Sequence, residues 1–166
     1  MLGFLFRRLT ADRAPGSPLF DTLTRIAREP HWYVEGEVPD TLDGRFAMLA
    51  TVTALAMVRL ELDGPAGDAA SVALTERFIE VMESEHRELG LGDPTLGKTV
   101  RKLVGMLAQR TDLWRSVGRF PEATRESLYK DEVAPDALAH SSAALQRFAD
   151  RLAQAELAEI ERGNIA

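Results

Sequence analysis

The chain has no cysteine and no long apolar run. The absence of cysteine excludes disulfides, thiolate-bound metals and cysteine nucleophiles. The longest apolar stretch, residues 46–58, lies between Arg45 and Arg59, whereas a membrane-spanning helix requires about 20 apolar residues. We therefore expect a protein that does not cross a membrane and does not use thiol chemistry.

Strand-like patterns are missing as well. No segment alternates apolar and polar residues, aromatic residues make up only 7% of the chain, and Ala, Leu, Arg and Glu are frequent, a composition that favours helix. We predict an all-α, single-domain bundle of six or seven helices over residues 17–166, preceded by a separate segment, residues 1–16. The predicted helices span about residues 17–29, 41–62, 68–89, 93–118, 122–130 and 136–162.

The predicted helix over residues 41–62 is apolar nearly all round, which indicates that it is the central, most buried helix. Asp40 is its predicted N-cap. The sequence Asp-Gly-Pro-Ala-Gly at residues 63–67 is predicted to separate it from the next helix.

The net charge of −6 argues against DNA as a partner, because bulk attraction to phosphate is absent. The charge is nevertheless uneven, since residues 98–119 carry six basic residues and one acid. Lys98, Arg101 and Lys102 fall on the predicted solvent face of their helix. They are candidate partner-binding residues for acidic loops, phospholipid headgroups or ribosomal RNA, and the alternative is a merely solvated surface.

The N-terminal segment is amphipathic. Leu2, Leu5, Phe6 and Leu9 share one helical face, so the segment either lies in a membrane interface or packs back on the body. It resembles neither a secretory signal nor an organelle presequence, so we expect a cytoplasmic protein, peripheral to the inner membrane. The candidate interfacial residues are Phe4, Leu5, Phe6, Arg7 and Arg8.

Residues 92–99, Gly-Asp-Pro-Thr-Leu-Gly-Lys-Thr, match the phosphate-loop pattern. A phosphate loop follows a buried strand, but residues 83–90 are the charged end of a predicted helix. Gly92 is therefore predicted to be a helix C-cap and Gly97 a close packing contact. Nucleotide binding by this loop remains an alternative hypothesis, as does a lipid, quinone or haem pocket between helices.

No metal site, cofactor or catalytic residue is predicted. Glu83 and His86 have the three-residue spacing of di-iron bundles, but such sites need a second pair, and neither His31 nor His140 follows a glutamate at that spacing. The histidines fit no hydrolase pattern either. We expect a protein that is not an enzyme.

Two segments carry a family resemblance: residues 38–49, Val-Pro-Asp-Thr-Leu-Asp-Gly-Arg-Phe-Ala-Met-Leu, and residues 90–102, Gly-Leu-Gly-Asp-Pro-Thr-Leu-Gly-Lys-Thr-Val-Arg-Lys. They resemble the signature segments of the ubiquinol–cytochrome c chaperone family, with similarity from about Ser17 through the last helix. The resemblance implies a helical, non-enzymatic chaperone that helps newly made cytochrome b mature. It also implies partners, namely cytochrome b or another assembly protein of the bc1 complex, the ribosome, or a small partner protein.

Trp32 and Tyr33 precede the first of these segments and are predicted to lie in a loop. They are candidate client-binding residues together with Arg45, and the alternative is that the two aromatic rings close the end of the bundle. Asp43, Gly44 and Asp93 are predicted to be structural. Asp43 and Arg45 are further expected to pair with Asp93 or Lys98 and so to join the two signature segments.

Overall fold

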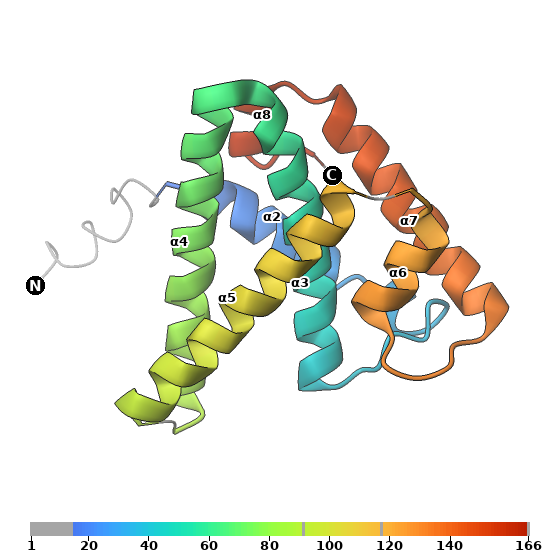
Figure 1. Ribbon diagram of the computed structural model, residues 1–166, viewed down its shortest axis with the longest axis horizontal. Coiled ribbons are helices and arrows are strands. Elements are labelled where there is room, and N and C mark those ends of the chain that lie inside the picture. The colour runs from blue at the N-terminus through green and yellow to red at the C-terminus, as the bar shows by residue number, and fades with distance from the viewer. Residues whose placement is uncertain (1–14, 91, 117, 166) are drawn as a thin grey trace, which may run out of the picture.

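The computed structural model describes residues 15–90, 92–116 and 118–165 (Figure 1). The candidate interfacial residues of the N-terminal segment lie outside this part of the chain. The prediction of an all-α bundle is confirmed, because the described residues contain only helices and their connections. The helices are α2 (Ser17–Ala27), α3 (Leu42–Leu60), α4 (Gly64–Glu88), α5 (Asp93–Arg115), α6 (Phe120–Leu128), α7 (Pro135–Gln154) and α8 (Leu157–Glu161), with 3₁₀ turns at Pro30–Trp32 and Glu61–Asp63.

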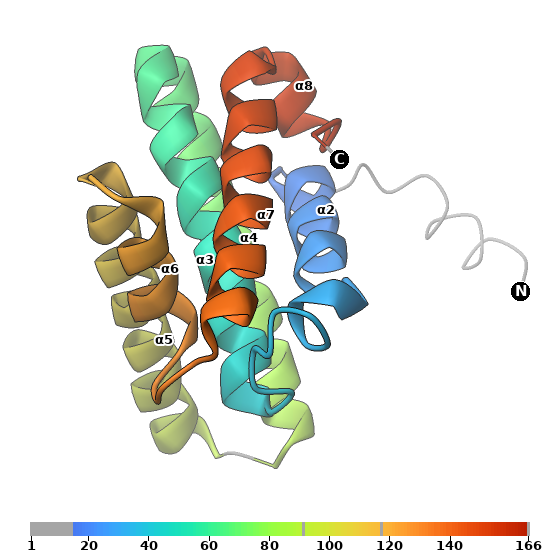
Figure 2. The ribbon, with the colours of Figure 1, turned by 90° about the vertical axis from the view of Figure 1, so that its right-hand side faces the viewer.

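Helix α3 is the centre of the bundle, as predicted. Figure 2 shows α5 and α6 on one side of α3 and α2 on the other, and α3 contacts α2, α4, α5, α6 and α7. Met48, Val52 and the alanines between and after them are wholly buried along its length. Small alanine side chains let the neighbouring helices approach closely, and the apolar surface that they bury stabilises the fold.

The start of α3 differs from the prediction. Thr41, not Asp40, is the N-cap, because the Thr41 hydroxyl accepts a hydrogen bond from the Gly44 amide at 3.1 Å. Asp40 instead accepts a hydrogen bond from Nε of Arg45 at 2.6 Å. A side chain at position 44 would collide with the carbonyl group of Pro39, so glycine is required where the chain folds back on the first turn.

Two helix boundaries also differ from the prediction. Helix α4 begins at Gly64, so residues 63–67 are not an open connection: a single 3₁₀ turn joins α3 to α4. The predicted last helix is divided, because Ala155 is extended and α8 then begins with a capping box formed by Glu156 and Glu159.

Arg59 of α3 explains where α7 ends. Its guanidinium donates hydrogen bonds to the carbonyls of Leu152 and Ala155 at 2.9 and 2.8 Å and pairs with Asp63 at 2.5 Å. These carbonyls lie at the C-terminal end of α7, where a cation is favoured by the helix dipole and by acceptors that lack a helical partner.

The segment between α2 and α3 is tied to the rest of the bundle. Trp32 is only 2% exposed, and its indole N–H donates to the Ile26 carbonyl at 2.8 Å. The Tyr129 hydroxyl donates to the Gly36 carbonyl at 2.5 Å, and Nδ1 of His31 lies 3.0 Å from Nε2 of His140 on α7. Trp32 is therefore a core residue of a 3₁₀ turn rather than an exposed loop aromatic.

Candidate functional site: a groove around the start of α3

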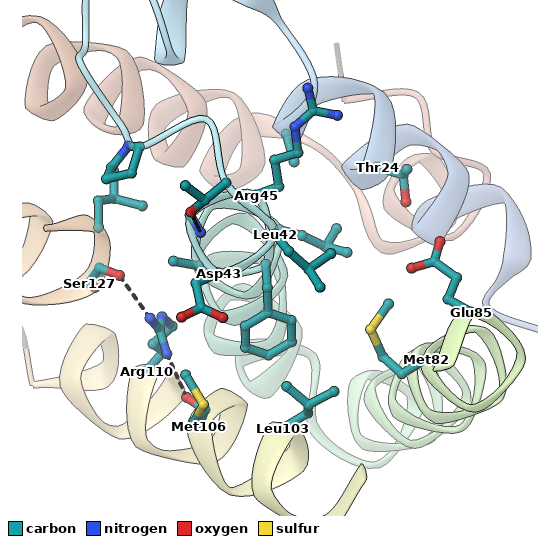
Figure 3. Close-up of a pocket in the computed structure, with 18 of the residues that line it drawn as sticks. Thr24, Leu42, Asp43, Arg45, Met82, Glu85, Leu103, Met106, Arg110 and Ser127 are labelled. Carbon is teal, nitrogen blue, oxygen red and sulfur yellow. Dashed lines mark hydrogen bonds between the residues drawn. The ribbon is translucent and has the colours of Figure 1, made fainter. Parts of the chain in front are cut away.

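A groove of about 940 Å³ surrounds the first turns of α3. Figure 3 looks along α3 and shows α2 and α4 on one side of the groove, with α5 and the end of α6 on the other. The groove exists because the side chains of the first turns of α3 do not fill the space between this helix and its neighbours. The first signature segment, residues 38–49, lines much of it.

The lining of the groove is largely apolar. Leu42, Phe46 and Leu49 follow one face of α3 at helical spacing, and Leu42 is 67% exposed. Methionine side chains adapt to differently shaped ligands, and the groove contains two. The remaining apolar contributors from the neighbouring helices are Phe20, Ala27, Val81, Met82, Leu103, Met106 and Leu128.

Charged side chains surround this apolar lining, and several are paired. Lys130 contacts the Asp43 carboxylate at 2.8 Å, and this hydrogen bond, reinforced by the charges of Lys130 and Lys102, lowers the pKa of Asp43. The hydrogen bond from Arg45 likewise lowers the pKa of Asp40. Arg77 pairs with Glu80 at 2.8 Å.

Tyr33 and Arg45 form one edge of the groove. The Tyr33 hydroxyl donates to the Ala27 carbonyl at 2.6 Å, and the Arg45 guanidinium lies 5.9 Å from the centre of the Tyr33 ring, within the range of a cation–π contact. Burial raises the pKa of Tyr33, so this hydroxyl stays a neutral donor at physiological pH.

Arg110, which was not among the site residues predicted from the sequence, also lines the groove. Its guanidinium donates to the carbonyls of Met106 and Ser127 at 3.2 and 2.9 Å (Figure 3), and burial lowers its pKa. A sequence signal was present. Arg110 follows Leu107 by three residues and precedes Trp114 by four, so it is a cation within the apolar face of α5.

The groove contains only some of the predicted site residues. Tyr33, Asp43, Gly44, Arg45 and Lys102 line it. Trp32 does not, because it is buried in the core. Lys98 and Arg101 are exposed on α5 outside the groove.

The expected ion pairs between the two signature segments are wrong, although Lys102 of the second segment lines the groove beside the first. Asp43 pairs with Lys130 and Arg45 with Asp40, so neither forms an ion pair with Asp93 or Lys98. The turn between α4 and α5 instead lies at a tip of the molecule (Figure 1, lower left).

The two glycines of the phosphate-loop pattern also differ from the prediction. Gly92 is the N-cap of α5 rather than the C-cap of α4, and Gly90, with φ of 84°, is the left-handed residue after α4. A side-chain carbon at Gly97 would meet nothing within 4 Å, so Gly97 is not a close packing contact. Because α4 precedes this turn and no strand occurs in the described residues, the geometry is not the strand–loop–helix of a phosphate loop.

Two further features are absent from the described ranges. Residues 15–90, 92–116 and 118–165 contain no group of three or more histidines or carboxylates able to hold a metal ion. No helix in these ranges has the length and apolar character to span a bilayer.

Comparisons with known proteins agree with the fold. A solved structure described as the Cbp3 homolog from Brucella abortus is similar to this chain, with a TM-score of 0.76 and 26% sequence identity over 100% of this chain and 96% of the other. A comparison with curated protein sequences gives no significant match. The family model described as ubiquinol–cytochrome C chaperone matches residues 35–165, a range that includes most of the groove. The chain therefore belongs to the ubiquinol–cytochrome c chaperone family.

Proposed function

We propose that this chain is a non-catalytic assembly chaperone that binds an apolar segment of newly made cytochrome b in the groove around the start of α3. Membership of the ubiquinol–cytochrome c chaperone family supports a role in assembly of the bc1 complex. The choice of cytochrome b as client, over another assembly protein of that complex, follows from the family resemblance of residues 38–49 and 90–102.

One observation carries the choice of the groove. Leu42 is 67% exposed although it begins the most buried helix of the fold, and it lies beside Phe46 inside a concave, mostly apolar surface. An exposed apolar side chain in a concavity with a polar rim is typical of a binding site. The volume of about 940 Å³ accommodates several client side chains.

Two further contacts are part of the proposal. The exposed cations Lys98, Arg101 and Lys102 on α5 contact acidic loops, lipid headgroups or the ribosome, and the N-terminal segment keeps the chaperone at the cytoplasmic face of the inner membrane. Replacing the three cations by glutamate is expected to weaken partner capture without unfolding the protein.

Removing residues 1–10 is expected to shift the protein from the membrane fraction to the supernatant, and unchanged partitioning would contradict the anchor.

The proposal is tested by complementation in the native host. Deleting the gene is expected to lower the amount of assembled bc1 complex several-fold and to leave unrelated dehydrogenases unchanged. A Leu42→Asp variant is expected to fail to restore the complex, because it places a charge in the apolar groove. The matched control is Leu62→Asp, since Leu62 is 79% exposed and does not line the groove. Full restoration by Leu42→Asp would contradict the proposal.

A lipid, quinone or haem ligand is a second candidate for the same groove. His86 lines it, and because Nδ1 of His86 lies 2.7 Å from the Met82 carbonyl, Nε2 is the ring nitrogen left for a ligand. Haem would give the purified protein a visible absorbance band, and a lipid or quinone would appear in an organic extract. The absence of both would dismiss this candidate.

A further inference from the structure

Arg110 is a partly buried cation whose partners are all uncharged. Its two terminal nitrogens donate to the backbone carbonyls of Met106 and Ser127, and its Nε is buried without a hydrogen-bond partner. No carboxylate in the described part of the chain forms an ion pair with it. A charge withdrawn from water is costly unless an opposite charge accompanies it.

Two other arginines of the groove do have such a partner, and a third, Arg28, is exposed to solvent. Arg45 pairs with Asp40 at 2.6 Å and Arg77 with Glu80 at 2.8 Å. Asp43 also lines the groove, but the hydrogen bond of its carboxylate comes from Lys130. Arg110 is thus a partly buried arginine of the groove that lacks a carboxylate, although a guanidinium binds carboxylates in a two-pronged geometry.

The unmet hydrogen bonds of the molecule gather in the same place. Five buried side-chain polar atoms lack a partner in the described residues, and three of them line the groove: Oγ1 of Thr24, Nε of Arg77 and Nε of Arg110. Buried polar atoms are normally satisfied. The groove lining thus holds donors that no protein acceptor meets, which favours a ligand with acceptor atoms as well as apolar surface.

We infer that the groove recognises an apolar client segment that carries one carboxylate side chain, and that Arg110 binds this carboxylate. The inference rests on the proposed function and specifies the chemistry of the client. Lys102, about two turns earlier on α5, is exposed and also lines the groove without an ion pair, so it adds a second attraction.

A single negative charge suits the groove better than a phosphate group. Glu126 and Asp131 also line this side, and their charges oppose a dianion more than a monoanion. The apolar side chain of Met106 lies next to Arg110 in the close-up, and Leu42 also lines the groove; both suit the aliphatic neighbours of one glutamate or aspartate.

The test uses two fluorescein-labelled, 18-residue peptides of Leu and Ala with lysine at both ends, identical except for one central Glu or Gln. Fluorescence anisotropy measures their affinity for the full chain at neutral pH. Hydrogen bonds to charged groups contribute about 1.5–3 kcal/mol, so we expect the Glu peptide to bind at least about tenfold more tightly. Arg110→Met is expected to reduce this ratio to about one, and Arg147→Met, at an exposed position of α7 outside the groove, is expected to preserve it.

The outcomes separate the two proposals. Equal binding of both peptides would overturn the inference about Arg110 while leaving the groove as a binding site. Binding of neither peptide would overturn the proposed function together with the inference. If circular dichroism shows that Arg110→Met does not fold, Arg110→Lys replaces it, because lysine retains the charge but loses the paired donors of the guanidinium. Arg110→Lys is expected to lower the ratio of Glu-peptide to Gln-peptide affinity several-fold. An unchanged ratio would overturn the inference.

Discussion

Gly44 illustrates how one residue shapes the groove. Its α-carbon lies so close to the Pro39 carbonyl that an added side-chain carbon would be 2.9 Å from the carbonyl carbon and closer still to the oxygen. We expect Gly44→Ala to lower the free energy of unfolding by about 1–3 kcal/mol, since backbone must move to relieve the overlap. Urea denaturation measures this change.

The matched control is Gly97→Ala. Gly97 lies in α5, and a side-chain carbon there would meet nothing within 4 Å. Because alanine favours helix over glycine by about 0.5–1 kcal/mol, this variant is expected to be slightly more stable than the original chain. Equal destabilisation by both substitutions would contradict the role assigned to Gly44.

Asp43 provides a prediction about pH. Its pKa lies below the usual range because of the hydrogen bond from Lys130 and the charges of Lys130 and Lys102. Since the pKa is depressed in the folded state, the associated stabilisation is present above the unfolded-state pKa and is lost as the pH falls through the folded-state pKa. NMR titration of the Asp43 carboxyl group is expected to show the depression, and Lys130→Ala is expected to raise the pKa. An unchanged pKa in that variant would contradict the pairing.

Single residues also show what the sequence could predict about the site. Tyr33, Arg45 and Lys102 were selected from loop position, resemblance and helical spacing, and they line the groove. Trp32 follows the alternative prediction, in which its ring closes the end of the bundle; the local sequence could not decide between that position and an exposed one. The partners of Asp43 and Arg45 were wrong because ion pairs depend on how distant helices meet, and Arg110 was missed although its place in an apolar stripe was visible.

Among the helices, the central α3 was the most predictable, because an element that is apolar nearly all round must be buried. The division between α7 and α8 was not predictable from the local sequence. Ala155 is neither glycine nor proline, and the break depends on Arg59, which reaches the carbonyls of Leu152 and Ala155 from a helix far away in sequence.

Arg59→Met tests this explanation. The Arg59 side chain is 14% exposed, and its removal leaves two carbonyls and the Asp63 carboxylate without their donor. We expect a loss of about 2–3 kcal/mol in the free energy of unfolding and faster amide hydrogen exchange over residues 152–165. Arg147→Met, at an exposed position of α7, is the control. Unchanged exchange over residues 152–165 in Arg59→Met would show that another contact ends α7.

For the molecule as a whole, the bundle holds most of its apolar residues in a single core and leaves a smaller set around the start of α3 accessible. The fold class and family were predictable because helical periodicity and the signature segments are local properties of the sequence. The groove was not, since it is formed by the ends of helices from different parts of the chain, and no local pattern encodes how those ends meet.

Photocrosslinking in living cells tests directly whether this groove holds the client. A photoreactive amino acid is placed at position 42 in the groove or at position 62 in the 3₁₀ turn after the opposite end of α3, two exposed leucines in the original chain. We expect newly made cytochrome b to crosslink to position 42 and not to position 62. Crosslinking to position 62 alone, or to neither position, would contradict binding in the groove.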